Sequence, residues 1–108
     1  MYVNFRNPNT TRHGGGFDSF TIQLVWNKGY VIPGQDPNVL REDRCGALIR
    51  RDKYGDTTPK GLGWEIDHNM PVAKGGTDSL DNLQPLQWEN NRGKGDSFPS
   101  WTCAVKAA

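Results

Sequence analysis

A chain of 108 residues has room for one domain, and a domain of this size buries only a modest core. Hydrophobic residues make up only 34% of it, and thirteen glycines with seven prolines favour short elements joined by loops. The net charge of +1 gives no electrostatic signature of a nucleic-acid binder, and no apolar run approaches the ~20 residues of a membrane span, so no membrane association is expected.

The first part of the chain is polar and contains three consecutive glycines. We therefore predict a flexible N-terminal arm over residues 1–16, followed by one domain over residues 17–108. His13 lies within this arm, where a solvated side chain is the default expectation.

The next segment, residues 17–26, has apolar side chains at every second position from Phe20 to Trp26, a period of two that predicts a first strand. A turn is expected at residues 27–29. Two prolines and a glycine predict a loop over residues 33–37.

Two further elements precede the most informative part of the chain. Residues 38–44 are expected to form a short helical turn. Residues 45–51 are predicted as a second strand with Ala47 and Ile49 on one face, and glycines favour a loop over residues 57–63.

The following elements are predicted as strand, loop, strand and helix. Residues 64–66 form the first of these strands and residues 83–87 the second. A helix is expected to start over residues 88–92 and to end near Gly93 or Gly95.

This order of elements brings together three polar residues that are far apart in sequence: Asp67 and His68, at the end of the first strand, and Asn91, in the helix. Mg²⁺ prefers oxygen ligands and keeps several waters, so the carboxylate and the amide suit it. A histidine, which ordinarily titrates near neutral pH, can take a proton from an attacking water. The three residues are sufficient for metal-assisted hydrolysis of a phosphodiester.

The same residues carry a resemblance to a known family. Asp67-His68, Asn82 and Asn91 resemble the three signature positions of the HNH nucleases, in the variant whose last position is asparagine. The flanking residues agree in order and spacing: Pro71, Gly75, Gly76, Leu83, Gln84, Pro85, Leu86, Lys94 and Gly95.

The resemblance implies a small α+β domain with a ββα-metal motif over residues 64–96, preceded by short strands. It implies that Asp67 and Asn91 bind one divalent ion and that His68 is the general base. Asn82 would pin the loop that holds His68 through hydrogen bonds to backbone. Mg²⁺ is the expected ion, with Mn²⁺, Ni²⁺ or Zn²⁺ able to replace it in vitro, and duplex DNA is the expected partner.

Charged residues around this motif suggest supporting roles. Glu65 precedes Asp67 by two positions and points to the same side of a strand, where it would support the metal or be a solvated or ion-paired acid. The candidate phosphate contacts are Arg50, Arg51, Arg92 and Lys94. Taken singly, each of these four is more often a solvated surface charge.

The cysteine pattern argues against structural zinc. Many small members of the family have cysteines at the positions of Gln87 and Asn90, paired with an upstream CxxC. This chain has only Cys45 and Cys103, and neither belongs to such a pair, so no structural zinc is expected. Packing would then hold the local fold, for which the candidates are Trp64 and Trp88.

The two cysteines also bear on the compartment. Without a recognisable signal peptide we expect a cytoplasmic protein, and in the reducing cytosol Cys45 and Cys103 would remain free, buried thiols.

Three functions are compatible with the sequence. The leading hypothesis is a metal-dependent endonuclease that hydrolyses DNA. The second is a nucleic-acid-binding module that keeps the fold without turnover, which the low net charge slightly favours. The third is a structural accessory subunit of phage or mobile-element machinery. The trio of Asp67, His68 and Asn91 favours the enzyme, because a binding module has no use for it.

Overall fold

The computed structural model describes residues 6–107, which form two α-helices and two antiparallel sheets. The helices are α1, Ser19–Trp26, and α2, Trp88–Lys94. The first sheet has the order β1, Tyr30–Val31, β2, Leu40–Glu42, and β3, Leu48–Arg50; the second is a hairpin of β4, Trp64–His68, and β5, Leu83–Gln87. Short 3₁₀ turns occur at Arg51–Lys53, Val72–Lys74 and Leu80–Asn82. The predicted small α+β domain with short strands ahead of the motif is confirmed.

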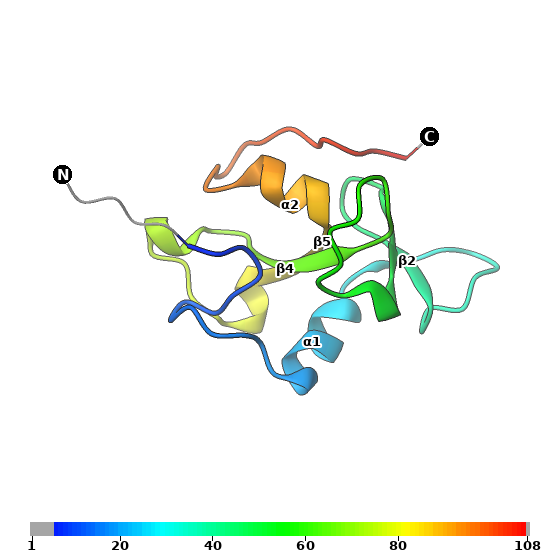
Figure 1. Cartoon of the computed structure of the whole chain (residues 1–108), viewed down its shortest axis with the longest axis horizontal. Coiled ribbons are helices and arrows are strands. Elements are labelled where there is room, and N and C mark those ends of the chain that lie inside the picture. The colour runs from blue at the N-terminus through cyan, green and yellow to red at the C-terminus, as the bar shows by residue number, and fades with distance from the viewer. Residues whose placement is uncertain (1–5, 108) are drawn as a thin grey trace.

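The β4–β5 hairpin lies at the centre, with α2 on one face and α1 on the other (Figure 1). Successive strand residues point to opposite faces. In β4, Trp64 and Ile66 therefore face the core with α1, whereas Glu65 and Asp67 face α2, to which both are joined by polar contacts. The hairpin thus separates an apolar layer from a polar one.

The apolar layer joins α1, the first sheet and the hairpin. Its aromatic centre is the indole of Trp64, whose ring centroid lies 5.3 Å from that of Trp26 and 4.9 Å from that of Tyr54. The fully buried members of this core are Val25, Trp26, Ile49, Trp64, Ile66 and Leu83. Large aromatics therefore compensate for the small number of apolar residues, as expected for so short a chain.

The predicted strand over residues 17–26 is wrong, because the structure has α1 there. Asp18 caps the helix by accepting a hydrogen bond from the backbone N–H of Thr21. Val25 and Trp26 are buried in the core and Ile22 packs against it, a helical spacing, whereas Phe20 is 72% exposed. The apolar residues of this segment fit both the strand period of two and the helical period of about 3.6, and packing against the core selected the helix.

The helical turn predicted for residues 38–44 is wrong over Leu40–Glu42, where β2 is the central strand of the first sheet; a turn is confined to residues 37–39. β2 pairs with β1 on one side and β3 on the other. The strand predicted over residues 45–51 is found as the shorter β3, and Ala47 and Ile49 are both buried as predicted.

The hairpin and the helix of the motif match the prediction closely. β5 occupies the predicted residues, and β4 extends the predicted strand to His68. The side chain of Gln87 caps α2 by accepting hydrogen bonds from two backbone N–H groups, and the helix ends at Lys94 with Gly95 as its C-cap. Trp64 is buried as predicted, whereas Trp88 is half-buried.

The prediction of free thiols is wrong, because Cys45 and Cys103 form a disulfide. The segment after α2 runs back along that helix (Figure 1), and Val105 exchanges two hydrogen bonds with the Asn90 side chain. This return brings the two cysteine Cα atoms to 5.9 Å, within the range of a disulfide. A contact made by the end of the chain could not be read from cysteine spacing.

Residues 1–5 of the predicted arm lie outside the described residues. Residues 6–12 follow an irregular path but are hydrogen-bonded to the rest of the domain. Asn9 Oδ1 accepts from the backbone N–H of Ile66 at the free edge of β4 and from the Tyr54 hydroxyl, each over 2.8 Å. This covers a backbone donor that an edge strand would otherwise expose. Across residues 6–107, no helix has the length and apolar character that a membrane crossing requires.

Candidate active site

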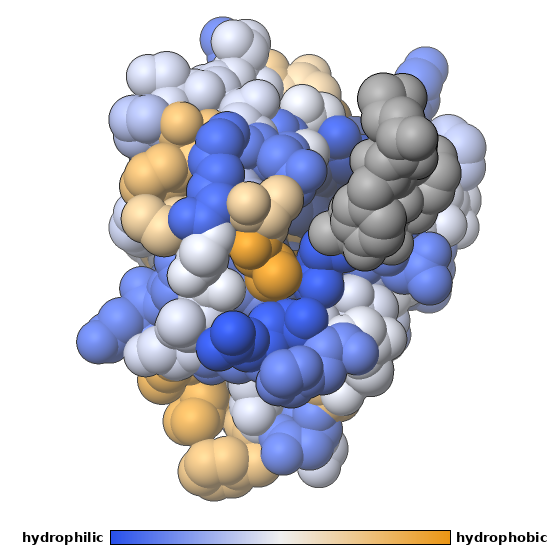
Figure 2. All heavy atoms as spheres, turned by 90° about the vertical axis from the view of Figure 1, so that its left-hand side faces the viewer, coloured by the Kyte–Doolittle hydropathy of each residue, from blue (hydrophilic) through white to orange (hydrophobic). Residues whose placement is uncertain are grey.

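A cavity of about 150 Å³ opens where β4 ends. Figure 2 looks onto this side of the molecule, where hydrophilic residues predominate around a small apolar area. The cavity is lined by the N-terminal segment, by β4 and the loop after it, and by α2 with the residues just after that helix. The lining residues are 6–10, Ile66, Asp67, His68, Pro71, Val72, Asn91, Arg92, Gly95 and Asp96. The structure therefore brings Asp67, His68 and Asn91 together, as the order of elements predicted.

Asp67 is a buried carboxylate held by two neighbours. Its Oδ2 accepts a hydrogen bond of 2.9 Å from Gln84 Nε2, and its Oδ1 lies 3.3 Å from the Lys94 ammonium. Burial raises the pKa of Asp67 above its ordinary value, although Gln84 and Lys94 oppose this rise. Each oxygen has two lone pairs, so both retain acceptor capacity toward the cavity.

Asn91 is oriented by Glu65. The Asn91 amide donates from Nδ2 to Glu65 Oε1 over 2.9 Å. A carboxylate can only accept, so the NH₂ side of the amide must face Glu65, and Oδ1 takes the opposite side. Within the described residues, Oδ1 has no hydrogen-bond partner, which leaves it available as an oxygen ligand.

Glu65 accepts the hydrogen bond from Asn91 and also forms an ion pair with Arg92. Arg92 donates to both of its oxygens, from Nε over 3.0 Å and from Nη2 over 2.9 Å. These contacts raise the pKa of Arg92, the hydrogen bond first and the charge of Glu65 after it. The structure places Glu65 in an ion pair with Arg92, one of the roles that the sequence left open, and Glu65 also positions Asn91.

His68 ends β4 with its imidazole hydrogen-bonded to Asp78, at 2.7 Å between Nε2 and Oδ1. The ring of Phe17 lies beside it, with the two centroids 6.1 Å apart. Nδ1 has no hydrogen-bond partner among the described residues. Nδ1 is therefore the ring nitrogen that is free to bind a water molecule or another ligand.

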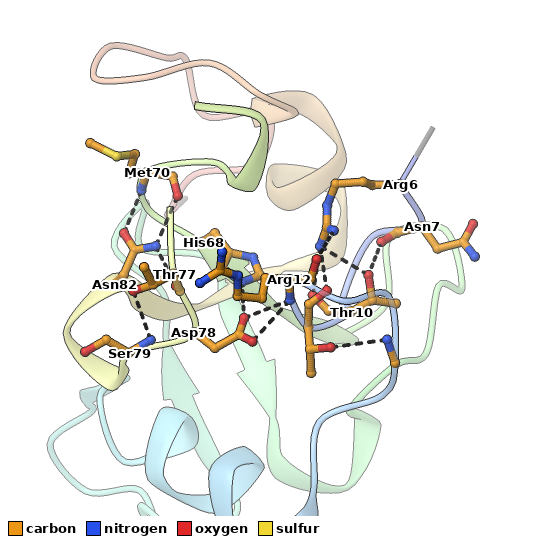
Figure 3. Close-up of polar contacts among 12 residues, drawn as sticks. Arg6, Asn7, Thr10, Arg12, His68, Met70, Thr77, Asp78, Ser79 and Asn82 are labelled. Atoms are coloured by element: carbon orange, nitrogen blue, oxygen red, sulfur yellow. Dashed lines mark hydrogen bonds and ion pairs between the residues drawn. The ribbon is translucent and has the colours of Figure 1, made fainter. Parts of the chain in front are cut away.

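Asn82 ties the loop after His68 to β5. Its Oδ1 accepts from the Met70 backbone N–H over 2.8 Å, and its Nδ2 donates to the carbonyl oxygens of Met70 and Thr77 (Figure 3). The backbone N–H of Asn69 donates to the Asn82 carbonyl over 2.7 Å. A Cβ at Gly76 would overlap the Met70 carbonyl oxygen, so the loop also requires glycine there.

The residues around Asp67 and Asn91 fit a hard divalent ion. Asp67 offers a carboxylate and Asn91 an amide oxygen, and hydrogen bonds with Gln84 and Glu65 hold these two side chains in place. Among residues 6–107, no group of three or more His, Cys, Asp or Glu side chains could hold a metal. A set this sparse suits Mg²⁺, which keeps several waters, better than a closed zinc site.

The four predicted phosphate contacts separate into three places. Arg92 lines the cavity, exposed and anchored on Glu65. Arg50 pairs with Asp52, and Arg51 donates to Gln23; neither lines the cavity. Lys94 is buried, with its ammonium donating to the His68 carbonyl over 3.0 Å, so the structure does not place it at the surface.

Sequence reasoning missed Gln84, Asp78 and Asn9. Gln84 stands directly opposite Asp67 in the hairpin, so the register of the two predicted strands would have found it. Asp78 and Asn9 carry no such signal, because a loop and an irregular segment deliver them.

Comparison with known proteins assigns the family. A family model described as HNH endonuclease matches residues 43–97, about half of the chain. The chain belongs to the HNH endonuclease family. No curated protein and no solved structure matches it.

The HNH match covers β3, the hairpin and α2, and so includes Asp67, His68, Asn82 and Asn91. HNH nucleases generally use a divalent metal ion, and membership indicates a nucleic acid substrate. The N-terminal wall of the cavity, residues 6–10, lies outside the matched segment. This HNH domain therefore includes a part of its cavity that the family motif does not describe.

Proposed function

We propose that this protein is an endonuclease that hydrolyses DNA phosphodiester bonds with Mg²⁺ held by Asp67 and Asn91 and with His68 as the general base. The observation that carries the proposal is the convergence of these three side chains on one cavity from β4 and α2. Each has an acceptor free for the task assigned to it, as described above.

In this mechanism His68 accepts the proton of the attacking water through Nδ1. When bound, the divalent ion supplies positive charge that stabilises the phosphate oxygens and the leaving oxygen. Asp67 and Asn91 hold the ion, and Gln84 and Glu65 keep these two side chains in place. Asn82 fixes the start of the loop that follows His68.

Arg92 is the proposed phosphate contact. Two of its nitrogens bind Glu65, which fixes the guanidinium at the cavity wall. Its Nη1 makes no hydrogen bond to the described residues and can donate to a phosphate oxygen.

A second candidate is a nucleic-acid-binding module without turnover. It is favoured by the Lys94 ammonium, which lies 3.3 Å from Asp67 and already compensates the charge that would attract a metal ion. The net charge of +1 points the same way, because tight binding to phosphates needs several cations.

Cleavage of supercoiled plasmid distinguishes these functions. The parent should nick or linearise DNA with Mg²⁺ or Mn²⁺, with Ni²⁺ and Zn²⁺ as further ions to compare, and EDTA should abolish the activity. Asp67→Asn should lose cleavage and weaken Mn²⁺ binding, whereas Asp81→Asn removes the same charge from an exposed loop site and should behave as the parent. DNA bound but never cut would support the binding module, and activity that survives EDTA would refute the metal mechanism.

A further inference from the structure

We propose that Asp78 is a positioning residue for His68 and that the N-terminal segment, residues 9–12, holds Asp78 in place. This inference rests on the proposed role of His68 as the base. Its central contacts are the 2.7 Å hydrogen bond between Asp78 and His68 Nε2 and the hydrogen bond that the Arg12 backbone N–H donates to the same carboxylate (Figure 3).

The hydrogen bond decides which nitrogen of His68 can act. Burial favours the protonated form of Asp78, but the hydrogen bonds from His68 and Arg12 outweigh it, and the pKa of Asp78 lies below its ordinary value. An ionised carboxylate only accepts, so in the neutral imidazole the proton is on Nε2. The lone pair is then on Nδ1, the nitrogen without a partner in the described residues.

The Asp78 carboxylate is in turn held by the N-terminal segment. The Arg12 N–H donates to Oδ1 over 2.9 Å and approaches Oδ2 at 3.2 Å, although the two residues are 66 positions apart. The Arg12 side chain is exposed, so the backbone rather than the guanidinium makes this contact.

Two anchors fix the path of this segment. The Arg6 guanidinium donates to the carbonyl oxygens of Thr10, Thr11 and Arg12, which draws these carbonyls to one side of the segment. Asn9 is tied to the edge of β4 through Ile66. The segment is thus attached to the same strand that carries His68, and the Arg12 N–H is left to face Asp78 (Figure 3).

This arrangement assigns to the N-terminal segment, which lies outside the family match, an effect on the reacting group. Asp78 fixes the proton and the orientation of the ring, and Arg12 fixes Asp78. Removal of either restraint should lower kcat and leave KM close to the parent value, because substrate contacts such as Arg92 are unchanged.

The first test compares Asp78→Ala with Asp81→Ala. Both remove one negative charge from the same loop, but the Asp81 side chain is exposed and makes no hydrogen bond to the described residues. In ¹⁵N-histidine NMR spectra at about pH 8.5, roughly two units above the ordinary pKa of an imidazole in a model peptide, the parent and Asp81→Ala should show a protected proton on His68 Nε2. Asp78→Ala should lose that signal and lose about 10²-fold in kcat, the effect of a misplaced reacting group.

The second test isolates the Arg12 backbone. Arg12→Pro removes the N–H donor, and Arg12→Ala keeps it. The Gly14 N–H donates to the Thr11 carbonyl, so Arg12 is the second residue of a β-turn, a position that accommodates proline. Arg12→Pro should reduce both the protection of the Nε2 proton and kcat, whereas Arg12→Ala should match the parent.

Equal behaviour of Asp78→Ala and Asp81→Ala, or a parent with the proton on Nδ1, would overturn the role of Asp78. Equal behaviour of Arg12→Pro and Arg12→Ala would show that the N-terminal segment does not hold Asp78 in place. The NMR measurement uses the whole chain without DNA or metal. A parent that shows the Nε2 proton but never cleaves DNA would therefore refute the proposed function and support the positioning contact.

Discussion

The carboxylate of Asp43 accepts a hydrogen bond from the side-chain amide of Asn90 over 2.9 Å, which joins the segment between β2 and β3 to α2. Both residues are buried. The same carboxylate accepts from the backbone N–H groups of Cys45, Ala47 and Gln87, so its four acceptor positions are filled. Gln87 and Asn90, the two positions considered in the sequence for a zinc-binding cysteine pair, are instead connected by this hydrogen-bonded carboxylate.

Asp43→Asn should therefore destabilise the domain. The amide NH₂ would face donors that now bind an oxygen, and each buried donor left without a partner costs about 1–3 kcal/mol. We expect the free energy of unfolding in urea to fall by about 2–4 kcal/mol. Asp52→Asn, at an exposed surface ion pair, should change it by less than about 0.5 kcal/mol. Equal effects of the two substitutions, or stoichiometric zinc in the purified protein, would contradict this account.

His68→Ala should abolish most of the cleavage and leave the fold intact. Loss of a general base reduces the rate by about 10²–10⁴-fold. The chain has one other histidine, the exposed His13, so His13→Ala is a control of the same residue type and should remain close to the parent. Single-turnover cleavage rates with saturating Mg²⁺, together with circular dichroism spectra, measure both effects. Cleavage by His68→Ala at the parent rate would exclude His68 as the base.

Arg92 and Arg50 should differ in their effect on DNA binding. Both are exposed arginines paired with an acid, but only Arg92 lines the cavity. In a His68→Ala background with Ca²⁺, Arg92→Gln should reduce the slope of log affinity against log salt by about 1, the loss of one phosphate contact. Arg50→Gln should leave the slope unchanged. An equal reduction for both would mean that DNA also covers the first sheet.

Breaking the disulfide should destabilise the domain strongly. Cys45 and Cys103 are separated by 58 positions, and for a loop of this length the chain-entropy model gives about 4 kcal/mol. Unfolding of the parent in urea should therefore shift to lower denaturant on addition of dithiothreitol. The double substitution Cys45→Ser, Cys103→Ser should start at the shifted value and not respond to the reductant. A parent that is insensitive to dithiothreitol would argue that the bond contributes little.

The sequence by itself determined the centre of this protein. β4, β5 and α2 were predictable because each has a local signal: a short apolar strand before the Asp-His pair, a second apolar run, and glycines after the helix. The convergence of Asp67, His68 and Asn91 follows from the order of these elements alone. Such local signals can be recognised in the sequence without any knowledge of packing.

Only the tertiary structure decided the elements whose pattern was ambiguous. The segment Ser19–Trp26 carries apolar side chains at both helical and strand spacing, and its burial against Trp64 selected the helix. The segment Leu40–Glu42 is a strand because strands on both sides supply its hydrogen bonds. Local preferences are weak relative to such contacts.

The tertiary structure also decided which charges surround the cavity. Lys94 and Arg92 are two positions apart on one helix, yet the first is buried against β4 and the second is exposed. Asp78 reaches His68 across ten positions, and Arg12 reaches Asp78 across 66. Hydrogen bonds at such separations depend on how the chain folds back on itself, and no spacing in the sequence encodes them.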